Sequence, residues 1–223
     1  RDAETRGPCN VGALVSLAAY SSNRVFACNY NQLFVIDLSA GTVREIGRPT
    51  GVATWMPTGL CYSPHNRRLT VANYRGGDIL LLRVQADLSV ALEGRLHGGG
   101  LRAPENVAVS PDGSLLVVAD YRAGAVFAFD AASNRLWKVN LGHAHGVAIG
   151  ADGGIYASGL LPPRVVKLDP AGKKIGRLDK EGWGPGEFLW PTGVAVLGDE
   201  RVAVADAHNG KIHILDRDLQ VLS

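Results

Sequence analysis

The chain has 223 residues, a net charge of +2 and 46% hydrophobic residues. This near-neutral charge does not favour nucleic-acid binding through global electrostatics, and no apolar run is long enough to span a membrane. The length suits one domain with its own hydrophobic core. The chain begins at Arg1 without an initiator methionine, so the compartment stays open between the cytoplasm and secretion after removal of a signal peptide.

The predicted elements are short strands from residue 11 onward, preceded by a polar leading segment, residues 1–10. Runs of four to seven residues rich in Val, Leu, Ile and Ala alternate with turn sequences such as Ser110-Pro111-Asp112-Gly113. Such side chains fit a pleated sheet, and Gly, Pro and Asp favour tight turns. The strands fall into sets of four, which are expected over residues 11–50, 57–97, 104–140, 144–180 and 191–223.

Each set opens on a similar phrase whose second residue is Thr58, Glu105, His145 or Thr192, spaced 47, 40 and 47 residues apart. A weaker copy opens near Val11-Gly12-Ala13-Leu14, and residues 219–222 are expected to be the last strand. Four strands per period of this length are typical of β-propeller blades. The chain is therefore predicted to be an all-β propeller of four-stranded antiparallel blades, five in number. A six-bladed propeller with one blade missing is the alternative.

The phrase also carries a family resemblance. Trp183-Gly184-Pro185-Gly186-Glu187-Phe188 is followed by Trp190-Pro191-Thr192-Gly193-Val194 and by Val204-Ala205-Asp206, and this stretch resembles an NHL repeat. A second good copy runs from Ala103 to Gly113, and the resemblance covers roughly residues 11–223. NHL propellers usually have six blades and most often bind a peptide, a protein, a glycan or RNA. The resemblance thus implies a binding module.

Propeller geometry places candidate ligand-binding residues on one face, around the mouth of a central channel. The start of each first strand and each loop from second to third strand should lie there, because in an antiparallel sheet the start of one strand lies beside the end of its neighbour. Two loops repeat a Tyr-Arg pair, which suits a carboxylate, a phosphate or an unstacked base. Duplication of a loop whose Arg pairs with a blade Asp is the competing interpretation. The predicted ligand-binding residues are Tyr30, Tyr74, Arg75, Tyr121, Arg122, His145, Thr192 and His208.

Other polar positions are expected to be structural. An Asn or Asp recurs at positions 29, 73, 120 and 206, where it should hold the turn backbone. His213 is expected inside a strand. Cys28 and Cys61 should behave as small buried hydrophobes, whereas Cys9 lies in the leading segment and is free or bridged.

We therefore expect a binding module without a cofactor, whose partner is a protein, a peptide or a small polar ligand; nucleic acid is a less favoured partner. The alternative is a metal-dependent lyase or lactonase-like hydrolase at the channel mouth. Glu105, Asp120 and His145 would then hold a divalent ion such as zinc or calcium, with Tyr121 or Arg122 polarising the substrate. A hydrogen-bonded, structural His145 competes with both functions.

Overall fold

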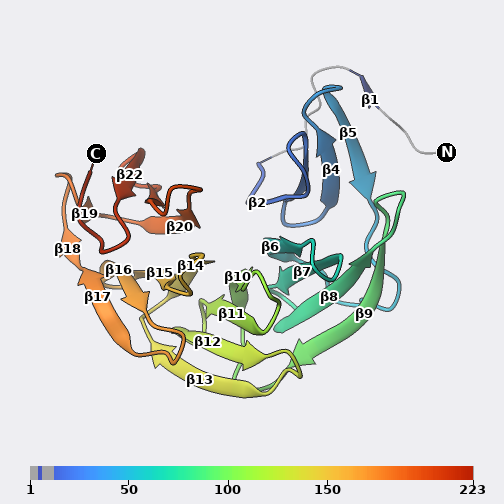
Figure 1. Cartoon of the computed structure of the whole chain (residues 1–223). Helices are drawn as coiled ribbons and strands as arrows, with labels where there is room; N and C mark the ends of the chain where they lie inside the picture. The colour runs from blue at the N-terminus through green and yellow to red at the C-terminus, as the bar shows by residue number, and fades with distance from the viewer. Residues whose placement is uncertain (1–4, 7–12, 223) are drawn as a thin grey trace. The chain divides into compact units, whose positions relative to one another are not determined.

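The computed structural model of the chain describes residues 5–6 and 13–222, and no helix occurs among them (Figure 1). The chain divides into two compact units, residues 1–104 and residues 105–223. Five antiparallel blade sheets follow one another along the chain, two in the first unit and three in the second. The predicted fold, an all-β propeller of five blades, is confirmed.

Unit 1 contains the first two blades. The first has the strand order β1-β5-β4-β3-β2 and the second has the order β6-β7-β8-β9. The strands of the first blade are β1 (Thr5–Arg6), β2 (Ser16–Ala19), β3 (Arg24–Cys28), β4 (Leu33–Asp37) and β5 (Thr42–Ile46). Those of the second are β6 (Pro57–Ser63), β7 (Arg68–Asn73), β8 (Asp78–Val84) and β9 (Val90–His97).

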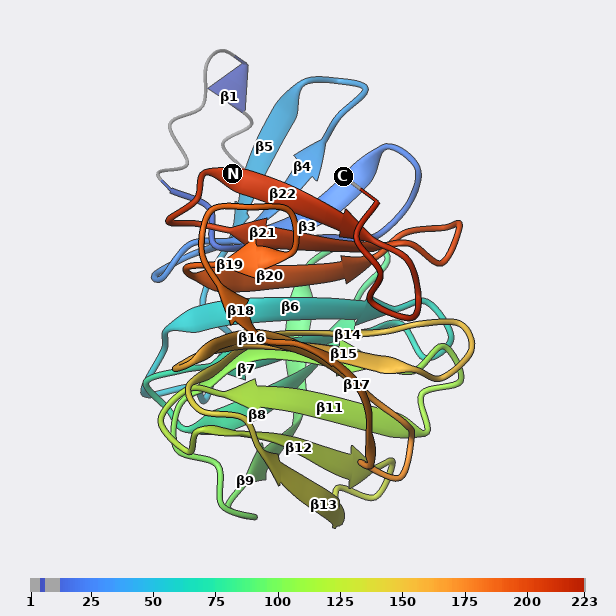
Figure 2. The same cartoon turned by 90° about the vertical axis from the view of Figure 1, so that its left-hand side faces the viewer.

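Unit 2 contains the other three blades, each with its strands in chain order, as Figure 2 shows for β20 to β22. The third blade has β10 (Pro104–Val109), β11 (Leu115–Asp120), β12 (Ala125–Asp130) and β13 (Arg135–Asn140). The fourth has β14 (Ala144–Ile149), β15 (Ile155–Leu160), β16 (Pro163–Leu168) and β17 (Lys174–Leu178). The fifth has β20 (Pro191–Val196), β21 (Val202–Asp206) and β22 (Lys211–Leu215).

Three details differ from the sequence-based expectation. Residues 219–222 form no full strand: Val221 makes a single antiparallel bridge to Leu215, because the turn after β22 uses residues up to Gln220. The first blade also includes β1, which pairs with β5 and lies in the expected leading segment, whereas the predicted opening near Val11 lies outside the described residues together with Cys9. The connection before the fifth blade contains a short parallel pair, β18 (Lys180–Glu181) and β19 (Glu187–Phe188).

Packing between neighbouring blades explains why alternation is blurred in the sequence. All six residues of β15 are buried, because the blades of unit 2 cover it on both sides. The outer strands β9 and β13 alternate between more exposed and less exposed residues, since one of their faces meets solvent. Cys28 is fully buried, as predicted, and Cys61 is partly buried.

A buried Asn or Asp at the end of the second strand attaches the connection that leads into the blade. Asn73 accepts a hydrogen bond from the Met56 amide at 2.8 Å and donates to the Thr54 carbonyl at 2.9 Å. Asp206 accepts hydrogen bonds from the amides of Leu189 at 2.9 Å and Trp190 at 2.7 Å. The structural interpretation of these positions is confirmed.

We predict that Asp206→Ala destabilises the protein by about 3 kcal/mol or more, because two backbone N–H groups lose a charged acceptor. Urea unfolding followed by circular dichroism measures the loss. Asp199→Ala is the matched control, because the exposed Asp199 carboxylate contacts the side chain and amide of the neighbouring Arg201, and its loss should cost less than about 1 kcal/mol. Equal effects of the two substitutions would contradict the proposed role of Asp206.

Candidate functional site

The candidate site lies at one edge of unit 2, which we call the entry edge: the edge where the first strands begin and the second strands end. The register shows this arrangement, because Ala144 at the start of β14 pairs with Gly159, and Pro191 at the start of β20 pairs with Asp206. Glu105, His145 and Thr192 are the second residues of three consecutive first strands. They belong to the three blades of unit 2, and the structure brings Glu105 and His145 together.

A β-bulge occurs at this position in several blades. The register of β14 shifts between Ala144 and Val147, and that of β20 shifts between Pro191 and Gly193. An extra residue in a bulge is turned out of the regular ladder, which re-aims its side chain. In β20 the extra residue is Thr192, whose hydroxyl donates to the Ala205 carbonyl at 3.3 Å. Thr58 shows the same pattern in unit 1, where its hydroxyl donates to the Ala72 carbonyl at 3.4 Å.

Gly146 allows the fourth and fifth blades to approach closely beside His145. A Cβ atom on Gly146 would lie 2.3 Å from the Thr192 carbonyl oxygen and 2.9 Å from the Val194 nitrogen. The Ser158 hydroxyl joins the two strands, because it accepts from the Gly146 amide at 2.9 Å and donates to the Thr192 carbonyl at 3.0 Å. The backbone that carries His145 is therefore held on both sides.

Glu105 and His145 form the centre of the site. Glu105 Oε1 lies 3.7 Å from His145 Nε2, and the two side chains are 14% and 27% exposed. Burial raises the pKa of Glu105 to about 7, and the negative charge of Asp120 adds to this rise. Burial lowers the pKa of His145, although a hydrogen bond to the Thr192 backbone partly opposes it. At neutral pH a partly protonated carboxyl therefore faces an uncharged imidazole.

Aromatic rings extend the site beyond this pair. The Tyr121 ring meets the His143 ring edge-on, with centroids 4.6 Å apart, and lies 6.5 Å from the His145 ring. His143 has a φ of +46°, which is uncommon for a residue with a side chain, and its buried Nδ1 has no hydrogen-bond partner among the described residues. Strained residues of this kind cluster at functional sites. His143 was not among the predicted site residues; the signal in the sequence is the preceding Gly142, because glycine favours positive φ, which it adopts here.

The remaining predicted ligand-binding residues lie in the second-to-third loops of both units. Arg122 and His208 are exposed in unit 2, and the His208 ring stacks on Trp190 with centroids 4.7 Å apart. In unit 1, Tyr30 and Arg75 are exposed and Tyr74 is half-buried. Their part in ligand binding stays a prediction.

A metal centre finds no geometric support in the described part of the chain. Within residues 13–222 and the short strand at 5–6, no group of three or more His, Cys, Asp or Glu side chains is arranged to hold an ion. Of the three predicted ligands, Glu105 and His145 approach each other, whereas Asp120 Oδ1 accepts a hydrogen bond from the Ala123 amide at 2.8 Å. This bond is the turn contact expected at the recurring Asx position.

His213 forms a second buried pair that the sequence analysis treated only as a strand residue. It is 3% exposed, its Nε2 lies 3.7 Å from Asp206 Oδ2, and its ring meets Phe188 edge-on. Burial lowers the pKa of His213. Its position in the interior of the fifth blade makes it a packing residue.

Comparison with known proteins shows the fold alone. No family model matches the chain, and no curated protein matches its sequence. A crystal structure of a protein of unknown function from Bacteroides caccae is similar with a TM-score of 0.70 and 15% identity, over 94% of this chain and 80% of that one. Hydrazine synthase from Kuenenia stuttgartiensis is similar with a TM-score of 0.61 and 20% identity, over 79% of this chain and 52% of that one. No helix in the described residues has the length and apolar character needed to cross a bilayer.

We predict that Glu105→Gln changes the pH dependence of stability. The folded-state pKa of Glu105, about 7, lies above its ordinary value of 4.5, so the folded carboxyl holds its proton more tightly than the unfolded one. The wild type should therefore lose stability as the pH rises from about 4.5 through about 7, by up to about 3 kcal/mol. The variant cannot ionise and should become the more stable protein at pH 8 but not at pH 4.

Urea unfolding at several pH values measures the difference between the two proteins. Glu181→Gln removes an exposed carboxylate and controls for the loss of one negative charge. The lowered pKa of His145 has the opposite effect on the pH dependence of stability, because it causes stability to be lost as the pH falls. This effect is present in both the wild type and the variant. Parallel profiles of the wild type and Glu105→Gln would show that burial does not raise the pKa of this carboxyl.

Proposed function

We propose that this propeller is a binding module that holds an uncharged polar ligand, such as a peptide segment or a glycan, at the entry edge of unit 2. The fold is one that serves as a generic binding or scaffold module. The observation that carries the proposal is the Glu105–His145 pair, which is sheltered but still reaches solvent. The NHL-like phrase between Trp183 and Asp206 supports the same class of function.

The chemistry of the pair favours ligands that both donate and accept hydrogen bonds. A protonated carboxyl has one O–H donor and remaining acceptor capacity, and a neutral imidazole has one donor and one acceptor nitrogen. Peptide amides and sugar hydroxyls offer the same combination. The buried Asp120 raises the pKa of Glu105 through its negative charge, and the same charge disfavours an anionic ligand beside it.

The aromatic surroundings supply the apolar part of such a site. Tyr121 lies against His143 and close to His145, and it is only partly buried. Flat rings that carry a polar tip pack against the apolar faces of sugars and peptide side chains while keeping a hydrogen-bonding group available. His208, stacked on Trp190 in the fifth blade, adds a second partly exposed aromatic surface.

We predict that a ligand of this class perturbs the entry edge in a ¹⁵N–¹H correlation spectrum. The probes are a chitotriose, as a neutral glycan, and a capped tri-alanine peptide. At least one probe should shift the amide signals of Glu105, Tyr121 and His145 at pH 6.5, and His145→Phe should weaken its binding about tenfold, because a hydrogen-bonding group is lost.

The pH dependence of binding provides the sharper test. Wild-type affinity should fall between pH 6 and pH 8 as Glu105 ionises, whereas Glu105→Gln should bind with little change over that range. Arg201→Gln, on an exposed hairpin of the same unit, is the control for nonspecific effects. If neither probe shifts entry-edge signals, or if wild type and Glu105→Gln show the same pH dependence, the proposal is wrong.

A further inference from the structure

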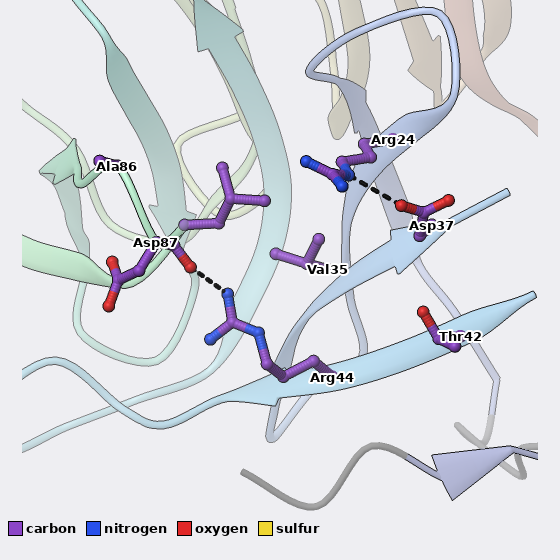
Figure 3. Close-up of a pocket in the computed structure, with 8 residues that line it drawn as sticks. Arg24, Val35, Asp37, Thr42, Arg44, Ala86 and Asp87 are labelled. Atoms are coloured by element: carbon purple, nitrogen blue, oxygen red, sulfur yellow. Dashed lines mark hydrogen bonds and ion pairs between the residues drawn. The ribbon is translucent and has the colours of Figure 1, made fainter. Parts of the chain in front are cut away.

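A cavity lies in unit 1, between the first blade and the turn that joins β8 to β9 (Figure 3). Its volume is about 250 Å³, and it opens between the outer strands of the first blade and the turn from β8 to β9. Its walls are formed by Arg24, Val35, Asp37, Thr42, Arg44, Ala86, Asp87 and Leu88.

The register of the first blade places both arginines on one face of the sheet. Arg24 pairs with Asp37, which pairs with Thr42, so these three residues form one row across the strands. Val35 pairs with Arg44 in a row two residues away along β4. Because side chains two residues apart share a face, the two guanidinium groups flank Val35, as Figure 3 shows. Val35 belongs to the core cluster that also contains Leu88, so the cavity has an apolar floor.

Asp37 orients Arg24 rather than neutralising a ligand site. Its Oδ1 accepts hydrogen bonds from the Ser39 amide and hydroxyl and from the Ala40 amide, at 2.6 to 3.0 Å. Its Oδ2 accepts from Arg24 Nε at 2.8 Å. The Ser39 hydroxyl and then Arg24 hold the pKa of this carboxyl well below its usual range. The carboxylate is thus occupied by its own turn, and it fixes one edge of the Arg24 guanidinium.

The other edges of the two guanidinium groups are available. One Arg44 Nη donates to the backbone carbonyl of Asp87 at 2.6 Å, and Arg24 donates only through Nε. The Asp87 carboxylate accepts from the amide and hydroxyl of Ser89 instead. Within residues 13–222, the remaining N–H groups of Arg24 and Arg44 have no hydrogen-bond partner. Two cations and two carboxylates, those of Asp37 and Asp87, therefore line the cavity, and each carboxylate already accepts hydrogen bonds within its own turn.

We propose that this cavity binds a small molecule through a carboxylate or phosphate group held between Arg24 and Arg44. A planar guanidinium presents paired donors that match the oxygens of either group, and such charge-assisted bonds are stronger than neutral ones. The Thr42 hydroxyl lines the same cavity as a further polar group, and Val35 and Leu88 accommodate a short apolar portion. The volume suits a phosphate monoester or a dicarboxylate and is below the usual range for a drug-sized ligand. The proposal is independent of the entry edge.

The test is titration of the full chain with inorganic phosphate and, separately, with succinate, at constant ionic strength and followed by ¹⁵N–¹H correlation spectra. Saturable shifts of the Arg24, Arg44 and Leu88 signals with one probe are expected, and they identify which anion the cavity prefers. Arg44→Gln and Arg24→Gln should each weaken this binding about tenfold or more, because each removes a charged donor pair. Arg201→Gln loses the same charge on unit 2 and should bind as the wild type does.

Arg44→Lys separates anion recognition from a merely structural role. It keeps the charge and can still reach the Asp87 carbonyl, but it lacks the planar fork, so binding should weaken while the urea midpoint changes little. A site of millimolar affinity corresponds to only about 4 kcal/mol of binding free energy, so the titration extends to about 20 mM. If neither probe binds the wild type saturably in this range, the proposal is overturned. It is overturned equally if the arginine variants lose stability but bind the anion unchanged.

Discussion

The hydrogen bonds of the buried Asn or Asp at the end of a second strand are the interaction on which the rest of the blade depends, as Asn73 and Asp206 show. Asn73 and Asp206 each bind the backbone of the segment that leads into their own blade, so they set the residue at which the first strand begins. Since side chains alternate along a strand, a start displaced by one residue would exchange the buried and exposed faces. The same contact fixes the bulge that follows, and with it the direction of Thr58 or Thr192. A polar side chain buried without hydrogen-bond partners would destabilise the fold, but the backbone of each of these two connections supplies partners to Asn73 and Asp206.

The fourth blade lacks this contact, and the candidate site is located there. Gly159 stands where other blades place Asn or Asp, and a Cβ at that position would lie 2.7 Å from the Leu141 carbonyl oxygen. The backbone of the connection therefore fills the space that the side chain occupies elsewhere. Leu160 donates to the carbonyl of Gly142 at 3.2 Å, which holds the connection through main-chain contacts. His143 follows with its left-handed backbone, and His145 then enters the bulge beside Glu105. Departures from local rules concentrate at functional positions, and this departure coincides with the strongest pKa shift at the entry edge.

The repeat made most of the fold predictable, because one phrase aligned strands, turns and Asx positions across blades. For example, strands β2 to β5 all lie within residues 11–50, the range predicted for the first set. Prediction failed where a tertiary contact overrides the repeat: no local pattern signals the parallel pairing of β18 with β19 in the connection before the fifth blade. The sequence also showed that His145 and Glu105 depart from the Thr at equivalent positions, but not that burial raises the pKa of Glu105 and lowers that of His145. The Arg24–Arg44 cavity was invisible, since it depends on strand register and on a turn more than 40 residues along the chain.

Electrostatics explains why the two proposed sites should take different ligands. At the entry edge of unit 2, burial and then the negative charge of Asp120 raise the pKa of Glu105, and the Asp120 charge disfavours a second negative charge there. Neutral hydrogen-bonding groups are the remaining choice there. In unit 1 the carboxylates of Asp37 and Asp87 each accept hydrogen bonds within their own turns, so the outer N–H groups of Arg24 and Arg44 are available to a ligand. In the unit 1 cavity an anion gains charge-assisted hydrogen bonds from the arginines, because the Asp37 carboxylate is engaged by its own turn. At the entry edge an anion is repelled, because the charge of Asp120 acts on the position of the ligand.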